Sequence, residues 1–236
     1  MPSISDEFGI NSIFEINASN QLREDRRNKK IISALPNIDQ TILEIGCGLG
    51  ELSFELAKNP KYQITALDQS KKFIDHLLSQ KNKSSIQFIQ STAKDHLKTK
   101  ENFYDAITGK GILHHIIPID SDFYRTLYKS LKPNGTIHFI EPNYSNPFCL
   151  LIFKIQFMRK LFRLDEFEMP LKLSETKKAL QSAGFFIEEI GHFDFFYPST
   201  PVRLLPIILF LEKYFLAAWP FSNLAQSIYL RAKKIP

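Results

Sequence analysis

Three glycines at alternate positions give the first indication that this chain binds a small ligand. Gly46, Gly48 and Gly50 follow a short apolar run that ends at Ile45, and apolar residues then recur at helical spacing. Because glycine has no Cβ, such a turn lets the backbone approach a bound molecule closely. The first N–H groups of the helix are unpaired and can contact polar atoms of that molecule. We therefore predict a ligand-binding turn between a strand and a helix.

Two classes of ligand use such a turn, and Glu51 distinguishes them. In the dinucleotide pattern G-x-G-x-x-G the third glycine stands where this chain has Glu51, whose carboxylate would lie against pyrophosphate. This disfavours a nicotinamide-dependent dehydrogenase. The pattern E-x-G-x-G-x-G instead resembles motif I of the Rossmann-like, class I methyltransferases that use S-adenosylmethionine (SAM), a cationic sulfonium without phosphate. The resemblance implies SAM contacts from Glu44, Gly46, Cys47, Gly48 and Gly50.

Further SAM contacts are predicted at the ends of the next two strands. Asp68 ends the alternating run Tyr62–Leu67, and a carboxylate about 20 residues beyond a glycine turn can bind two ribose hydroxyls. The alternative is that Asp68 caps the following helix. Relatives with motif I usually carry an Asp after the third strand, here Ile86–Gln90, but this chain does not. The resemblance therefore leaves adenine recognition to Gln69, Thr92 and Ala93.

The methyl acceptor is expected where the fourth strand, Phe103–Thr108, ends. Ligands bind at the carboxyl edge of an open parallel sheet, so we predict that Thr108 and Gly109 lie beside the methionine end of SAM. An oxygen or acidic carbon acceptor also needs a base with a pKa near neutrality, and His114 and His115 are the candidates. A structural role at a helix start is the alternative for both histidines.

Substrate contacts are predicted just after the fifth strand, Ile137–Ile140. Glu141 either binds a substrate hydroxyl or caps the turn, and Tyr144 follows it. The string L-K-P-N-G-T-I-H-F-I-E-P-N around this strand is similar to a segment of the small-molecule methyltransferases called type 11, as is the Leu-His-His that begins at Leu113. The matches follow the family's order over residues 42–143. The Asn/Asp-Pro-Pro-Tyr motif of base-amino methyltransferases is missing from the sequence, which counts against DNA adenine as substrate.

The resemblance implies one α/β domain over residues 1–236. Its expected fold is a Rossmann-like, seven-stranded and mostly parallel sheet, completed by a C-terminal antiparallel hairpin, with helices on both faces. At 236 residues and 44% apolar composition, the chain can bury such a core. Residues 41–143 are expected to form the SAM-binding core and residues 1–40 an N-terminal helical lid. The charged part of that lid, Leu22–Ile32, has the pattern of an exposed helix, and Ser174 is the predicted N-cap of a later one.

Two insertions, residues 144–173 and 194–226, are rich in apolar residues and are predicted to form a helical cap over the substrate site. The segment Phe148–Leu164 has no acid, which fits a helix on a membrane surface or beside an apolar substrate tunnel. Its basic residues are Lys154, Arg159, Lys160 and Arg163. The alternative is an amphipathic helix packed on the core. Charged residues interrupt the second insertion, so we expect no membrane span there.

Composition adds expectations about partners and location. The net charge of +5 arises from basic residues scattered among acids, so we expect no nucleic-acid interface. Two cysteines, Cys47 and Cys149, are too few for a disulfide framework or a metal cluster, so we expect a reducing compartment and no metal. The N-terminus lacks the features of a signal peptide, which favours a cytoplasmic protein. It would be peripheral at the inner membrane face if the apolar insertions bind lipid.

These features predict a SAM-dependent methyltransferase that acts on a small-molecule, lipid or lipid-linked glycan acceptor, at an oxygen atom. The alternative is a non-catalytic protein of the same fold that serves as a partner or membrane-surface subunit, which the missing acid at Thr92 permits. The acceptor and the oligomeric state are left open.

Overall fold

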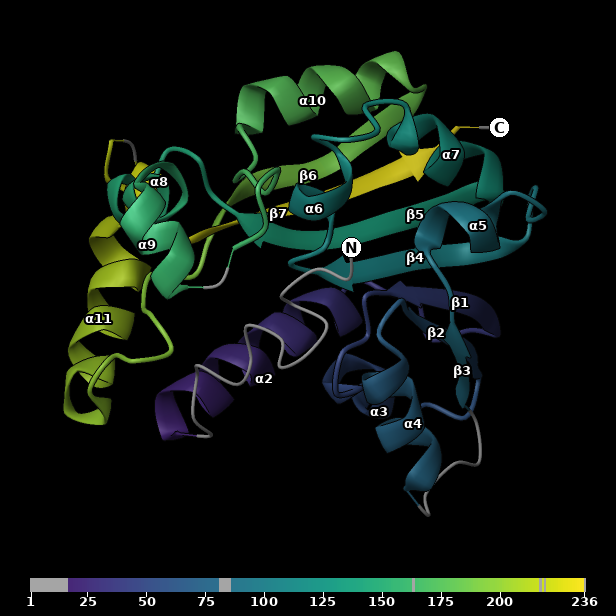
Figure 1. The fold of residues 1–236 in the computed structure, drawn as a ribbon, viewed down its shortest axis with the longest axis horizontal. Helices are drawn as coiled ribbons and strands as arrows, with labels where there is room; N and C mark the ends of the chain where they lie inside the picture. The colour runs from purple at the N-terminus through teal and green to yellow at the C-terminus, as the bar shows by residue number, and fades with distance from the viewer. Residues whose placement is uncertain (1–16, 81–85, 163, 217, 219, 236) are drawn as a thin grey trace.

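A seven-stranded sheet runs through the molecule in the order β3-β2-β1-β4-β5-β7-β6 (Figure 1). The computed structural model describes residues 17–80, 86–162, 164–216, 218 and 220–235. The strands are β1 Gln40–Ile45, β2 Tyr62–Asp68, β3 Ile86–Gln90, β4 Tyr104–Lys110, β5 Leu131–Pro142, β6 Phe185–Phe193 and β7 Ser227–Lys234. β1 pairs in parallel with both β2 and β4, whereas β7 pairs antiparallel with β5 and β6. The predicted mostly parallel sheet with a C-terminal antiparallel hairpin is confirmed.

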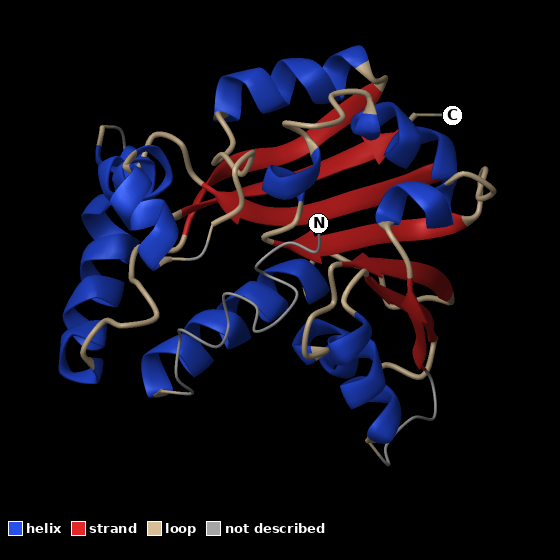
Figure 2. Cartoon of the chain, viewed as in Figure 1, coloured by secondary structure: helices blue, strands red, loops and turns tan. Residues whose placement is uncertain are grey.

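Helices cover both faces of this sheet (Figure 2), because neighbouring residues of each central strand point to opposite sides. Leu43 of β1 belongs to a buried cluster with side chains of α5 (Ala93–Leu97), α7 (Phe123–Ser130) and α10 (Leu173–Ser182). Ile42 belongs to a second cluster with side chains of α2 (Ala18–Ile32) and α3 (Glu51–Leu56). The short apolar run of β1 is therefore buried on both faces, as strands in the middle of a parallel sheet are.

The two insertions form mostly helical segments beyond the carboxyl ends of β4 and β5 (Figure 1). The first contains α8 (Pro147–Lys154) and α9 (Gln156–Leu161), and the second contains α11 (Leu205–Leu211) followed by a π-helical turn, Glu212–Leu216. Side-chain amides join them, because Asn143 Nδ2 donates to the carbonyl of Ala225 at 2.8 Å and Asn146 Nδ2 to that of Leu224 at 2.6 Å. The helical nature predicted for the insertions is confirmed. Among the described residues, no helix combines the length and the apolarity needed to cross a bilayer.

Two predicted helices differ from the observed ones. Phe148–Leu164 is not one helix, because the backbone is extended at Ile155 and separates α8 from α9. Ser174 is not an N-cap, because α10 already begins at Leu173. The earlier start of α10 follows from tertiary contacts: Leu171 forms a bridge with Asn143 next to the end of β5, and Leu173 packs on the core cluster. The N-cap position falls on Lys172, which makes no capping bond through its side chain.

The charged helix α2 was predicted to be exposed, and this is wrong for its arginines. The carboxylate of Asp194 is completely buried, and its Oδ2 lies 3.0 Å from Arg23 Nε and 3.1 Å from Arg27 Nε. Arg27 also donates to Ser227 Oγ at 2.6 Å. These ion pairs join α2 to the start of the second insertion, so both elements lie together beside the sheet. The first part of the predicted lid, residues 1–16, lies outside the described residues.

We predict that Asp194→Ala lowers the free energy of unfolding by about 3 kcal/mol, because it removes the buried carboxylate that pairs with both Arg23 and Arg27. Urea denaturation measures this change. Asp75→Ala is the matched control, because Asp75 forms an exposed pair with Lys71 on α4 (Lys71–Ser79) and should change stability by less than about 0.5 kcal/mol. Equal effects of the two substitutions would show that Asp194 does not hold α2 in place.

Candidate functional site

The turn between β1 and α3 requires its glycines. Gly46, Gly48 and Gly50 have φ values of 69°, 52° and 79°, in the left-handed region that other residues rarely adopt. A Cβ added at Gly46 would lie 2.9 Å from Ile112 Cδ1, and one added at Gly50 would lie 2.7 Å from Leu77 Cδ2. Conformation and space therefore both favour glycine at this turn, and ligand binding there remains a prediction.

Asp68 connects this turn to the carboxyl end of β2. Its Oδ2 accepts a hydrogen bond from the Gly48 N–H at 2.9 Å, and its Oδ1 accepts one from the Ser70 N–H at 2.8 Å. The N-cap of α4 is Ser70, so the alternative of Asp68 as the helix cap is wrong. These bonds hold both carboxylate oxygens at the carboxyl end of β2, beside the glycine turn. Ribose binding by Asp68 remains a prediction.

Two of the predicted cofactor residues turn their side chains into the protein. Glu44 is buried, and Ser53 Oγ of α3 donates a hydrogen bond to its Oε2. Burial raises the pKa of Glu44 to about 7, against the opposing effects of the Ser53 hydrogen bond and of Lys110. The thiol of Cys47 packs with Ala66 and side chains of α4, and burial raises its pKa. These side chains hold the turn against the sheet, and any SAM contact from these two residues would come from the backbone.

The residues predicted to bind adenine lie at the carboxyl ends of β2 and β3. Gln69 is exposed, and its carbonyl accepts a hydrogen bond from Gln90 Nε2 at 3.3 Å. Thr92 is the N-cap of α5: its Oγ1 accepts from the Asp95 N–H at 3.1 Å and donates to Asp95 Oδ2 at 2.7 Å. The methyl group of Ala93 packs in the core. The structure brings Gln69 and Thr92 to the same edge as Asp68, and their adenine contacts remain predictions.

At the end of β4, Thr108 and Gly109 have packing roles in the structure. The Thr108 hydroxyl is fully buried and donates to the carbonyl of Leu43 at 3.3 Å. A Cβ on Gly109 would lie 2.8 Å from both Ile112 and Phe139, so glycine lets these side chains close over the strand end. Sequence reasoning missed the next residue, Lys110, whose only signal is a cation at the end of this strand.

Lys110 joins the helix α2 to the edge that carries the glycine turn. Its Nζ lies 2.7 Å from Glu24 Oε2 and 2.7 Å from Asn28 Oδ1, both on α2, and 3.9 Å from Glu51 Oε2. Although burial raises the pKa of Glu24, the cations Lys110, Arg27 and Arg23 outweigh it and hold the pKa at about 2. The ionised pair therefore keeps α2 beside the carboxyl end of β4, and the role of α2 as part of a lid remains a prediction.

His114 and His115 lie in the short helix α6 (Leu113–Ile116), and Glu141 closes its N-terminus. Glu141 Oε1 accepts from the N–H groups of Ile112 at 3.0 Å and Leu113 at 2.9 Å, while Oε2 lies 2.9 Å from His114 Nδ1. Of the two roles considered for Glu141, the structure shows the capping role. His114 is buried, which lowers its pKa, although Glu141 opposes that effect. His114 is therefore neutral and held by Glu141.

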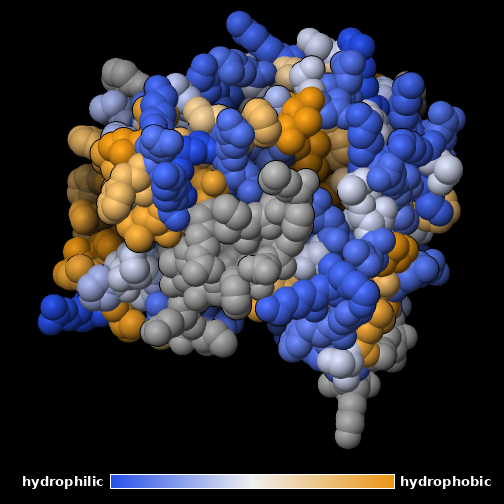
Figure 3. All heavy atoms as spheres, in the orientation of Figure 1, coloured by the Kyte–Doolittle hydropathy of each residue, from blue (hydrophilic) through white to orange (hydrophobic). Residues whose placement is uncertain are grey.

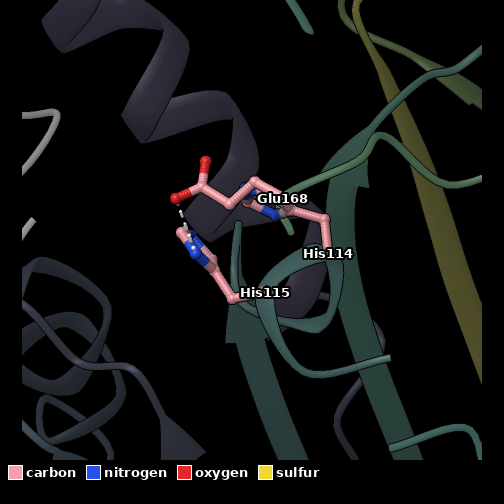
Figure 4. A group of neighbouring side chains, drawn as sticks. All are labelled: His114, His115 and Glu168. Carbon is pink, nitrogen blue, oxygen red and sulfur yellow. Dashed lines mark ion pairs between the residues drawn. The ribbon is translucent and has the colours of Figure 1, made fainter. Parts of the chain in front are cut away.

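His115 pairs with Glu168, a residue that sequence reasoning missed (Figure 4). His115 Nδ1 lies 2.9 Å from Glu168 Oε1, and the Glu168 carboxylate is buried while the imidazole is about one quarter exposed, at 24%. Burial alone would lower the pKa of His115, but the hydrogen bond and charge of Glu168 outweigh it and raise that pKa. His115 is thus the more accessible and the more basic of the two histidines.

Arg159 positions the loop that carries Glu168. Its guanidinium donates to the carbonyls of Phe153 at 2.6 Å, Glu168 at 3.1 Å and Asp165. Arg159 therefore does not belong to the basic membrane-facing set predicted from the sequence, because its donors are used inside the protein. Arg163, from the same predicted set, lies outside the described residues.

Tyr144 lies close to the end of β5 and between two lysines. Its N–H donates to the carbonyl of Leu171 at 3.1 Å, and its ring centroid lies 4.9 Å from Lys172 Nζ and 5.6 Å from Lys154 Nζ. The half-buried ring gives no direct indication of a ligand. Its predicted substrate contact remains a prediction.

Ile112 connects the glycine turn to the segment that carries the histidines. The side chain of Ile112 fills the space beside Gly46, and its N–H binds the same Glu141 carboxylate that holds His114. The structure thus places the glycine turn next to an imidazole–carboxylate pair. Such an arrangement can bring a bound cofactor and a second molecule together and accept a proton from the latter.

Comparison with known proteins identifies similar sequences. A family model described as "Methyltransferase domain" matches residues 42–135. The "Ubiquinone biosynthesis O-methyltransferase" of Hydrogenovibrio crunogenus is 30% identical over 166 residues, which are 66% of each protein. The protein of that name from Yersinia enterocolitica is 26% identical over 173 residues, 72% of this chain and 64% of the relative. The chain thus spans somewhat less than two thirds of these relatives.

Solved structures with the same fold are more distant in sequence. A SAM-dependent methyltransferase from Archaeoglobus fulgidus superimposes with a TM-score of 0.64 at 19% identity, covering 91% of this chain and 94% of the other. One from Thermotoga maritima superimposes with a TM-score of 0.68 at 16% identity, covering 98% and 97%. At these identities the likeness supports the fold.

We predict that Glu44→Gln changes how stability depends on pH. A carboxyl group whose folded pKa is raised to about 7 binds its proton more tightly in the folded state, so the wild type loses stability as pH rises from about 4.5 through 7. The variant lacks this loss. The free energy of unfolding of the variant minus that of the wild type should therefore be higher at pH 8 than at pH 5, by on the order of 3 kcal/mol. Urea denaturation without cofactor measures both values.

Glu55→Gln is the control for this experiment, because Glu55 lies on the same helix with an exposed side chain. It should leave the difference between the two pH values unchanged. The same result for Glu44→Gln would contradict the buried, proton-binding carboxyl.

Proposed function

Because the chain belongs to the class I SAM-dependent methyltransferases, enzymes whose cofactor is S-adenosylmethionine, we propose that it transfers a methyl group to an oxygen atom of a small-molecule or lipid-linked acceptor. The observation that carries the proposal is the hydrogen bond between the Gly48 N–H and Asp68, next to the histidines of α6. This bond supports the proposal because it brings the Asp68 carboxylate and a closely approachable backbone to one edge of the sheet.

The cofactor would lie along this edge, with its ribose at Asp68 and its amino-acid end over the glycine turn. The methyl group would then point toward the turn that precedes α6. Methyl transfer from a sulfonium is an in-line displacement: the acceptor oxygen attacks the methyl carbon, and the carbon–sulfur bond breaks to give S-adenosylhomocysteine. The protein contributes mainly by aligning the two molecules and excluding water.

The acceptor hydroxyl must also lose its proton, and the polar group on this side is the His114, His115 and Glu168 cluster. His115 is the member best placed to accept a proton, because it is partly exposed and its pKa is raised by Glu168. The relatives named as O-methyltransferases support oxygen as the methylated atom.

The acceptor class is supported by apolar surface on the two insertions. Figure 3 shows hydrophobic residues gathered where Figure 1 has α8, α9 and α11. We call this surface the apolar patch, and its most exposed members are Phe157, Leu161, Ile207, Phe210, Tyr214 and Phe215. Exposed Lys160, Arg203 and Lys213 lie on the same segments. Apolar side chains among cations suit contact with an anionic membrane that holds an apolar acceptor, at the cytoplasmic face.

We predict that the purified protein binds SAM and S-adenosylhomocysteine in calorimetry and that Asp68→Ala weakens both by about tenfold or more, because hydrogen-bond acceptors for the ribose are lost. Asp122→Ala, an exposed aspartate at the N-cap of α7, is the control and should bind as wild type does. Thermal denaturation checks that each variant is folded. If the wild type fails to bind either molecule at high micromolar concentration, the enzyme proposal fails and the non-catalytic alternative gains support.

We also predict that the protein floats with anionic liposomes. Replacing Phe157 and Phe210 together by serine should weaken this binding by about tenfold or more, because two exposed phenyl rings no longer insert into the lipid. Phe186→Ser is the matched control, because Phe186 is 57% exposed, as Phe210 is, but lies on the edge strand β6. Flotation that is equal in all three proteins, or absent from the wild type, would count against membrane contact.

A further inference from the structure

The three side chains His114, His115 and Glu168 have the composition and spacing of a metal-binding site. Each contributes one nitrogen or oxygen, and these three atoms lie within 4.8 Å of one another. The two histidines are consecutive in α6, and Glu168 reaches them from the loop before α10 (Figure 4). The two imidazole rings lie at a centroid distance of 4.1 Å, with their planes tilted by 40°. The cluster therefore combines two elements that are far apart in sequence.

The surroundings of His114 prepare it to bind an ion. Its Nδ1 is bound to Glu141 Oε2 at 2.9 Å, which leaves Nε2 as the free nitrogen of the ring. In metal sites, a ligating histidine usually donates its other N–H to a carboxylate, which fixes the tautomer and the ring orientation. Glu141 is itself held by the backbone N–H groups at the start of α6. His114 thus has the supporting contact expected of a ligand.

Glu168 provides an independent observation. Glu168 is only 1% exposed, and its Oε2 is buried without a hydrogen-bond partner among the described residues. A buried carboxylate oxygen without a partner is unfavourable, and native structures rarely contain one without a reason. The loop cannot easily turn this oxygen toward water, because Arg159 binds the carbonyls of Asp165 and Glu168. A cation bound by the Glu168 carboxylate beside the two imidazoles would compensate part of this cost.

We propose that His114, His115 and Glu168 bind one divalent transition-metal ion, for which Zn²⁺ is the appropriate probe. Two imidazoles and one carboxylate form a donor set typical of zinc, and three protein ligands leave one position open for water or a substrate oxygen. Mg²⁺ and Ca²⁺ fit less well, because they prefer sites made of oxygen ligands. This revises the expectation of no metal, which considered only the two cysteines.

The consequence for catalysis rests on the proposed methyl transfer. An acceptor hydroxyl bound at the open position would have a lowered pKa and would release its proton to solvent. The resulting oxygen anion attacks the methyl carbon, the O–C bond forms, and the C–S bond breaks to give a neutral thioether. In this arrangement the ion activates the acceptor in place of free His115.

The test is calorimetric titration of the full chain, stripped with a chelator, with ZnCl₂. We expect one ion per chain, and we expect Glu168→Gln to weaken binding at least tenfold, since it replaces an anionic ligand by a neutral amide of the same shape. His115→Ala should weaken it further. His76→Ala is the control, because His76 is exposed on α4 and its side chain forms a hydrogen bond with Gln80.

SAM binding by each variant, measured in parallel, separates this inference from the proposed function. Retained SAM binding shows that the variant is folded, because the cofactor contacts lie on the glycine turn and β2. A wild type that binds SAM but no Zn²⁺, or a Glu168→Gln variant that binds Zn²⁺ as tightly as wild type, overturns the metal site alone. Zn²⁺ binding without SAM binding supports the metal site and counts against the proposed function.

Discussion

The position of β1 between two parallel neighbours is the constraint on which the rest of the structure depends. Because β1 pairs with β2 on one side and with β4 on the other, the chain connections diverge at its carboxyl end. The backbone must turn sharply there into α3, and it does so through three glycines with positive φ. Ile112 packs against the first of these glycines, so the same turn fixes the start of the loop that carries the histidines.

Carboxylates give the two adjacent histidines different properties. The Glu141 carboxylate, at the end of β5, accepts hydrogen bonds from the N-terminus of α6 and contacts His114. Burial lowers the pKa of His114, which is therefore neutral. Glu168 comes from an insertion and faces His115, whose pKa it raises. The sheet therefore fixes the first histidine, while the first insertion, residues 144–173, raises the pKa of the second.

The sequence was most informative where a local pattern determines the structure. The apolar run, the glycines and Asp68 lie close together in sequence, and the structure joins them through the Gly48 N–H as their spacing suggested. Glu168 could not be found in this way. It lies 53 residues after His115, in a loop without periodicity, and only the packing of that loop brings the two together. Asp194 is a similar case, because its arginine partners lie more than 160 residues earlier and looked like the exposed face of a helix.

A crystal structure with S-adenosylhomocysteine bound would test the central claim most directly. The account predicts that the ribose hydroxyls bind Asp68, that the amino-acid end lies over Gly46, Gly48 and Gly50, and that the sulfur faces the turn before His114. A ligand whose ribose lies away from Asp68, or whose sulfur points away from α6, would contradict it.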